Sequence, residues 1–335
     1  MSLLDVKNLS ISFATPRGRL AAVRDLSFSL KAGETLALVG ESGCGKSLTA
    51  LALLGLLEPP AVMEGNGIFL EGRNLLTLDE PTLRSLRGSR IAMIFQEPMT
   101  ALNPVLTVGE QIMEVITEHE GGGRRAARAR AVALMEKVRI PDAERRFAEY
   151  PHRLSGGLRQ RVMIAMALAC SPAVLIADEP TTALDVTIQA QILDLIGTLK
   201  RENGTAVLFI THDLGLVGQH ADRVMVMYAG RVVEERTAAD LFADPLHPYT
   251  RGLIAARPGL GGSGRRERLM EIPGTVPGLG AMPVGCAFSP RCAFADDLCR
   301  STVPTSIDQA GGRIACHHSE GIHDREPAIR RIGNS

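Results

Sequence analysis

Hydrophobic and polar residues alternate over residues 4–13 and 22–30, and this period of two predicts half-buried strands. Farther along the chain, short runs of consecutive apolar residues end in polar side chains, as buried strands do. Stretches with helical spacing separate these runs. Further strands are expected at residues 35–39, 65–72, 91–95, 173–179 and 205–212, with two more within 221–233, and helices at 47–57, 75–90, about 105–165 (interrupted at 120–125) and 186–202.

This alternation of strands and helices predicts an α/β fold with a mainly parallel core sheet. Polar residues lie at or just beyond the C-terminal ends of several predicted strands. They are Lys46, Gln96, Asp178, Glu179 and His212. In open α/β sheets this edge is where ligands bind, so the five residues are candidates for one site.

The segment 236–335 differs in composition from the rest of the chain. Seven prolines between residues 245 and 290 interrupt any long element, and residues 259–264 are typical of a flexible link. We therefore divide the chain into a domain at 1–235 and an irregular C-terminal extension at 236–335. Something other than a large core is expected to stabilise the extension.

Composition narrows the class of protein. The 335 residues carry 37 Lys+Arg and 37 Asp+Glu, and a net charge of zero argues against nucleic acid as the main partner. Asp5 and Lys7 interrupt the N-terminus, which argues against a signal peptide. The apolar runs are too short to span a bilayer. A cytoplasmic protein is expected, one that can still dock onto a membrane protein.

Residues 40–47 match the phosphate-loop motif G-x-x-x-x-G-K-[ST] and lie between a predicted strand and a predicted helix. The glycines let the backbone approach phosphate oxygens, and the helix N-terminus favours an anion. Lys46 is expected to reach the β- and γ-phosphates, and the Ser47 hydroxyl to bind Mg²⁺. The candidate nucleotide contacts are Gly40, Glu41, Ser42, Gly43, Cys44, Gly45, Lys46, Ser47 and Leu48.

Two adjacent carboxylates end the strand predicted at 173–179. Asp178 is expected to hold Mg²⁺, and Glu179 to be the base that orients or deprotonates the water attacking the γ-phosphate. Gln96 is a further candidate for Mg²⁺ and for sensing the water. His212, at the same predicted edge, is a candidate for contact with the γ-phosphate.

A second anion site is predicted at Ser155, Gly156 and Gly157, which precede a helix and expose its first N–H groups. Two anion-binding helix N-termini in one chain suggest that one of them serves a neighbouring subunit.

These motifs, in this order over residues 40–212, resemble those of ATP-binding cassette (ABC) ATPases. The resemblance implies a P-loop NTPase fold with a RecA-like core, an antiparallel β subdomain and a helical subdomain at about 97–165. It also implies a head-to-tail dimer with ATP between the phosphate loop of one subunit and the Ser-Gly-Gly segment of the other. By position, Phe13 would stack on adenine, Asp185 would communicate across the dimer and Gln96 would link the nucleotide to a membrane subunit.

One position departs from the family pattern. The fifth residue of the signature segment, often Gln, is Leu158 here. The backbone N–H donors do not depend on that side chain, so the site is still expected to function.

Residues 95–104, 155–166, 247–253 and 272–277 resemble the D-type ATPase subunits of dipeptide, oligopeptide and nickel importers. The resemblance implies a homologous F-type ATPase subunit as heterodimer partner, two integral-membrane permease subunits and a periplasmic or surface substrate-binding protein. It places the chain at the cytoplasmic face of the cell (inner) membrane. The helical subdomain would transmit dimer closure and opening to the permeases. Peptide as cargo follows from the resemblance alone, and nickel chelates and glutathione stay open.

Four cysteines are concentrated near the C-terminus: Cys286, Cys292, Cys299 and Cys316. A cytosolic setting argues against stable disulfides, and four thiolates suit a [4Fe–4S] cluster or zinc. The absence of a C-x-x-C pair weakens the zinc interpretation. D-type subunits of this family carry a [4Fe–4S] cluster in this region, so the resemblance favours iron–sulfur. His317 and His318 are substitute ligands, and four unligated thiols remain the alternative.

Two other functions compete with an importer ATPase. A soluble ABC ATPase acting on nucleic acid would match the same motifs, although the neutral charge and the C-terminal segment count against it. A regulatory module that binds nucleotide without turnover would also match. It predicts ATP binding that Glu179→Gln leaves unaffected and no hydrolysis in the wild type.

Overall fold

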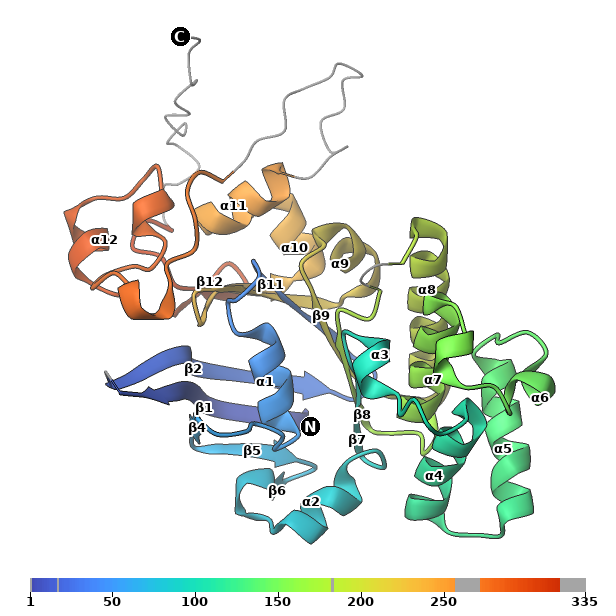
Figure 1. The fold of residues 1–335 in the computed structure, drawn as a ribbon. Helices are drawn as coiled ribbons and strands as arrows, with labels where there is room; N and C mark the ends of the chain where they lie inside the picture. Colours follow the sequence, from blue (N-terminus) through green and yellow to red (C-terminus); the bar gives the residue numbers. More distant parts are fainter. Residues whose placement is uncertain (1, 17, 182–183, 257–271, 320–335) are drawn as a thin grey trace, which may run out of the picture.

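The computed structural model describes residues 2–16, 18–181, 184–256 and 272–319. Residues 182 and 183 and the link predicted at 259–264 lie outside the described residues. Two sheets and the helices around them form the fold (Figure 1). This arrangement confirms the predicted α/β class with an antiparallel β subdomain and a group of helices.

The main sheet holds the strands that were predicted from continuous apolar runs. Its order is β12 (Ile307–Gln309), β13 (Gly312–Ile314), β11 (Arg231–Thr237), β10 (Arg223–Tyr228), β3 (Thr35–Val39), β9 (Ala206–Thr211), β8 (Val174–Asp178) and β7 (Ile91–Ile94). The five strands from β10 to β7 are parallel. Every residue of β3, β8 and β9 is buried, as expected of a sheet covered on both faces.

The N-terminal sheet is antiparallel. It contains β1 (Ser2–Thr15), β2 (Gly18–Lys31), β4 (Ala61–Glu64), β5 (Gly67–Leu70) and β6 (Arg73–Asn74). Its apolar face, including Leu4 and Phe28, packs with Leu36 and Leu38 of β3 in one core cluster. The sequence predicted β1, β2 and β5 but not β4, whose four residues follow two prolines.

The helices fall into groups around the sheets. They are α1 (Lys46–Leu53), α2 (Glu80–Leu86), α3 (Pro98–Ala101), α4 (Val108–Glu120), α5 (Arg124–Lys137), α6 (Ala143–Arg146), α7 (Gly156–Leu168), α8 (Val186–Asn203), α9 (Leu214–His220), α10 (Ala238–Ala243), α11 (Pro248–Ala255) and α12 (Asp297–Ser301). Short 3-10 helices lie at Leu75–Thr77, Pro151–Arg153, Leu279–Ala281 and Ser289–Arg291. Helices α4–α7 gather at one side of the sheets, and α12 lies at the other (Figure 1).

Local sequence sets where helix α1 ends and where helix α4 begins and ends. Helix α1 is shorter than predicted because Leu54 caps it and Gly55 follows with a left-handed φ of 62°. Helix α4 begins at a capping box formed by Thr107 and Glu110. It stops before Gly121, in the interruption that was predicted.

The C-terminal segment is more regular than predicted. Strand β11 continues past residue 235 to Thr237, and β13 and β12 extend the main sheet beyond it. Tyr249 and Phe288 belong to the same core cluster as Tyr228 of β10, with ring centroids of the Tyr228–Tyr249 pair 4.6 Å apart. The segment therefore shares the central core, which isolated aromatic residues in a proline-rich sequence do not reveal.

Candidate nucleotide site

The phosphate loop connects β3 to α1. Gly43 and Gly45 have φ of 80° and 105°, values that an L side chain rarely adopts. A Cβ at Gly40 would lie 2.2 Å from the carbonyl oxygen of Met227, so only glycine fits there. The buried Lys46 ammonium donates to the carbonyl oxygens of Gly40 (2.7 Å) and Glu41 (3.2 Å). The loop therefore presents a positive charge and the first N–H groups of a helix.

Asp178 lies at the end of β8, and its carboxylate is hydrogen-bonded to the Ser47 hydroxyl. Burial raises the pKa of the Asp178 carboxyl above its ordinary value. Its Oδ1 is buried and has no hydrogen-bond partner among the described residues. A hard cation that takes oxygen ligands would satisfy this atom, so Asp178 and Ser47 fit Mg²⁺.

Glu179 contacts two other residues that the sequence assigned to the same site. Its Oε2 accepts a hydrogen bond of 3.1 Å from Gln96 Nε2, and its Oε1 lies 3.1 Å from His212 Nδ1. Glu179 has a φ of 43°, an uncommon value for a non-glycine residue, while its N–H is tied to the carbonyl of Ile210 at 2.9 Å. Its carboxylate is thus fixed in place with the ends of β7 and β9 on either side.

The Ser-Gly-Gly segment begins α7, where the Ser155 hydroxyl accepts from the Leu158 N–H at 3.4 Å. It packs beside the start of α8. A Cβ at Gly156 would lie 3.9 Å from a methyl of Leu184, and one at Gly157 only 3.1 Å from a methyl of Ile188. The N-cap of α8 is Asp185, whose carboxylate accepts from Ile188 N–H at 2.9 Å. The segment and Asp185 are therefore neighbours on one surface.

Phe13 lies near the end of β1, where it pairs with Leu20 of β2 and Ala61 of β4. It is half-buried in the N-terminal sheet. Leu48, the last of the predicted loop contacts, is half-buried in the first turn of α1.

Sequence reasoning missed two residues that contact the phosphate loop, Tyr249 and Arg291. The Glu41 N–H donates to the Tyr249 hydroxyl at 3.0 Å, and Arg291 Nη1 lies 2.9 Å from Glu41 Oε2. Arg291 also donates to the Tyr228 hydroxyl at 3.3 Å. Tyr249 lies within residues 247–253, which resemble importer subunits, and Arg291 directly precedes Cys292. No pattern in the sequence indicated that either residue reaches the loop.

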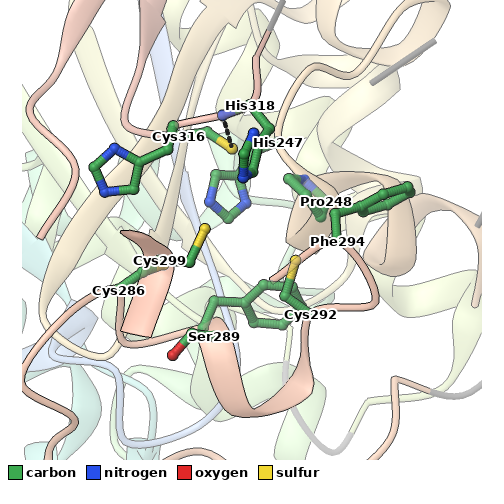
Figure 2. A pocket seen from close by; sticks show the side chains of 11 residues that line it. His247, Pro248, Cys286, Ser289, Cys292, Phe294, Cys299, Cys316 and His318 are labelled. Carbon is green, nitrogen blue, oxygen red and sulfur yellow. Dashed lines mark hydrogen bonds between the residues drawn. The ribbon is translucent and has the colours of Figure 1, made fainter. Parts of the chain in front are cut away.

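The four C-terminal cysteines line one cavity, together with His247, His317 and His318 (Figure 2). Burial raises the pKa of Cys292 to about 12 and that of Cys316 to about 11, and it raises the pKa of Cys286 and Cys299. A bound metal would reverse this effect because its positive charge stabilises thiolates.

Backbone N–H groups face some of these sulfur atoms. His318 N–H donates to Cys316 Sγ at 3.4 Å, and Cys286 is hydrogen-bonded by the N–H groups of Phe288 and Ser289. Such bonds favour the thiolate, so this donor set fits an iron–sulfur cluster or zinc. Ligand atoms of Asp296, Cys299 and His318 also lie within 4.8 Å of one another.

The described helices include none that is long and apolar enough to cross a membrane. Residues 23–182 match the family described as ABC transporter, and residues 233–299 match the C-terminal region of oligopeptide/dipeptide transporters. The chain is 54% identical to the oligopeptide transport ATP-binding protein OppD of Haemophilus influenzae over 89% of this chain and 91% of that one. This chain belongs to the ATP-binding proteins of peptide ABC transporters.

Other relatives agree with this family. A probable peptide ABC transporter ATP-binding protein of Sinorhizobium fredii is 53% identical over 96% of each chain. The solved dimer of the ATP-binding cassette MJ0796 with ADP and phosphate is 29% identical, with a TM-score of 0.64 over 70% of this chain and 98% of that one. The prediction of an ABC ATPase with an importer-type C-terminal region is confirmed, and the chain is an ATPase subunit of this class.

Proposed function

We propose that this ABC ATPase subunit energises uptake of di- or oligopeptides across the cytoplasmic membrane, from the cytoplasmic face. The contact of Glu179 with both Gln96 and His212 carries the hydrolytic part of the proposal. The names of the relatives and the match of residues 233–299 support the peptide cargo. Two permease subunits and a substrate-binding protein complete the proposed importer.

ATP is proposed to lie along the phosphate loop. Lys46 and the N–H groups at the start of α1 bind its phosphates, and Phe13 stacks on the adenine. Ser47, Asp178 and Gln96 are the residues proposed to hold Mg²⁺. When bound, Mg²⁺ neutralises charge that develops on the phosphates.

Glu179 is the proposed general base. Both of its carboxylate oxygens are held, by Gln96 on one side and His212 on the other, so the group is oriented before water arrives. Glu179 accepts the proton of the attacking water while the bond from the γ-phosphorus to the bridging oxygen breaks. His212, whose side chain is 63% exposed, is free to turn from Glu179 to the γ-phosphate.

The proposed active assembly is a head-to-tail dimer with the homologous F-type subunit. The exposed Ser155 and Gly156 open a second helix N-terminus, which would receive the γ-phosphate of ATP bound to the partner's loop. Asp185, beside this segment, would face the same interface. The dimeric state of the related MJ0796 cassette supports this arrangement.

The permease contact is proposed at the helical region, next to Gln96. Met99 and Val105 expose 53% and 75% of their surfaces there, so apolar side chains are available for a contact. A hollow in this region is lined by residues of α3, α4 and α7, including Gln111 and Glu118, and by Asn103 of the loop between α3 and α4. Movement of Gln96 on ATP hydrolysis would reach this surface directly.

Uptake measurements test the cargo. In a strain that lacks its own copy of this subunit, the wild-type gene is expected to restore uptake of labelled dipeptides and longer peptides, and Glu179→Gln is not. Glutathione and a nickel chelate are measured in the same cells. Restoration of either of these without peptide uptake would contradict the peptide assignment and leave the ATPase assignment standing.

A [4Fe–4S] cluster is proposed on Cys286, Cys292, Cys299 and Cys316. The four cysteines line one cavity, and N–H donors face the sulfurs of Cys286 and Cys316. After anaerobic purification we expect a brown protein with about four irons and four sulfides per chain. Cys292→Ser should lose them, whereas Cys170→Ser, a half-buried cysteine outside the cavity, should keep them.

Zinc is the alternative outcome of the same measurement. One zinc per chain without iron would contradict the cluster, and Asp296, Cys299 and His318 would then be the ligands to substitute first. Neither outcome affects the assignment of ATP hydrolysis, because the phosphate loop and Glu179 do not belong to this cavity.

A further inference from the structure

Arg291 joins three parts of the chain that are far apart in sequence. Its side chain is only 6% exposed. Nη1 contacts Glu41 of the phosphate loop at 2.9 Å and the Tyr228 hydroxyl at 3.3 Å. Nε and Nη2 donate to the carbonyl oxygens of Pro273 (2.8 Å) and Ile272 (3.2 Å). The guanidinium therefore makes directed bonds on all sides, as a planar fork of donors can and an ammonium cannot.

The contact with Glu41 is partly shielded from water. Glu41 exposes 29% of its side chain, and the Arg291 guanidinium lies 5.7 Å from the centre of the Tyr228 ring. An ion pair with few competing waters is stronger than one in solvent, and loss of one partner leaves the other without its counterion. The pair therefore restrains Glu41 more than a surface ion pair would.

A second residue of the C-terminal segment holds the backbone of Glu41. The hydroxyl of Tyr249 accepts the Glu41 N–H at 3.0 Å, and the Tyr249 ring is fully buried against Tyr228 and Phe288. Glu41 adjoins Gly40, whose carbonyl accepts from Lys46. Both the side chain and the N–H of one loop residue are thus fixed from outside the loop.

We propose that Arg291 and Tyr249 are positioning residues for nucleotide binding. They hold the turn at Glu41 in the conformation that receives the phosphates, so the C-terminal segment sets the affinity of the phosphate loop for ATP. The proposal rests on nucleotide binding at this loop, as in the proposed function, and does not require a cluster. Arg291 directly precedes Cys292, which lines the cysteine cavity, so a shift of the backbone at Cys292 would also move the residue that contacts the phosphate loop.

The test is a double-mutant cycle on the full chain, with Kd for MgATP and MgADP measured by calorimetry. Arg291→Gln and Glu41→Gln are each expected to weaken binding about 10-fold, within the 5–150-fold typical of coupled sites. The double variant should bind about as weakly as the weaker single variant. Arg291→Lys keeps the charge but not the fork, and is expected to recover part of the loss.

Further readouts separate positioning from a general structural role. In ATPase assays the single variants should raise KM and leave kcat within about twofold, as loss of uniform binding does. Arg300→Gln is the matched control, because Arg300 lies in the same segment and pairs with the exposed Asp297 rather than with the loop. If Arg291→Gln does not fold, Tyr249→Phe removes only the hydroxyl that accepts from Glu41 N–H, and should itself raise Kd about threefold to tenfold.

Two results would overturn the proposal. One is a folded Arg291→Gln chain that binds MgATP within twofold of wild type. If Arg291→Gln does not fold, MgATP binding by Tyr249→Phe that equals wild type would overturn the proposal in its place. The other is a double variant whose loss equals the product of the single losses, which would show that the residues act separately. Failure of the wild-type chain to bind nucleotide would instead overturn the proposed function.

Discussion

Replacing Glu179 with glutamine is expected to lower kcat for ATP hydrolysis by about 10²–10⁴-fold, the range for loss of a general base. Glutamine keeps the size of the side chain and can still contact Gln96 and His212, but it cannot take a proton from water. It also tolerates the φ of 43° no worse than glutamate does. Binding of MgATP should therefore stay close to the wild-type value, which calorimetry on the purified chain would measure.

The matched control is Glu202→Gln, at the end of α8, where the glutamate forms an exposed ion pair with Lys137. This variant should keep the wild-type kcat, since exposed pairs contribute little. Wild-type turnover by Glu179→Gln would show that another group accepts the proton. No hydrolysis by the wild-type chain with its partner present would instead favour a regulatory module without turnover.

The contacts of Glu179 could be anticipated because they follow from sheet topology. Gln96, Glu179 and His212 each follow a buried strand, and β7, β8 and β9 are adjacent and parallel. Parallel strands end at the same edge, so side chains that follow them meet there. The phosphate loop was equally predictable, since its strand, turn and helix are consecutive in the sequence.

The contacts of Arg291 could not be anticipated in this way. Arg291 and Glu41 are 250 positions apart, and neither belongs to a periodic pattern. Their meeting depends on Tyr249 and Phe288 packing on Tyr228 at the main sheet. Single aromatic residues among prolines form no periodic hydrophobic pattern that would predict a helix or strand. The strands β12 and β13 have only three residues each, too few to show such a pattern. The sequence therefore predicted an irregular extension where the structure has part of the central core.

Replacing Gly156 with aspartate is expected to abolish the contribution of this chain to ATP-driven dimer closure. In the proposed dimer the partner's γ-phosphate lies at the start of α7, and a carboxylate there would repel it. Like charges 4 Å apart near a protein surface interact by about 4 kcal/mol, which corresponds to a loss of about 10²–10³-fold. The measurement is the dimer fraction with the proposed F-type subunit at a saturating concentration of a non-hydrolysable ATP analogue, which prevents turnover at both sites.

Gly156→Asp is chosen because it should not disturb folding, so a loss of dimer closure can be attributed to the added charge. A Cβ at Gly156 would lie 3.9 Å from Leu184, an ordinary contact, whereas one at Gly157 would press on Ile188 at 3.1 Å. A carboxylate near a helix N-terminus stabilises the helix by about 0.3–1 kcal/mol. Gly156→Asn has nearly the same shape without the charge and should lose much less. ATP binding to the isolated Gly156→Asp chain should be unchanged, because its own phosphate loop is intact. Dimer closure equal to wild type would show that this helix N-terminus receives no phosphate from the partner.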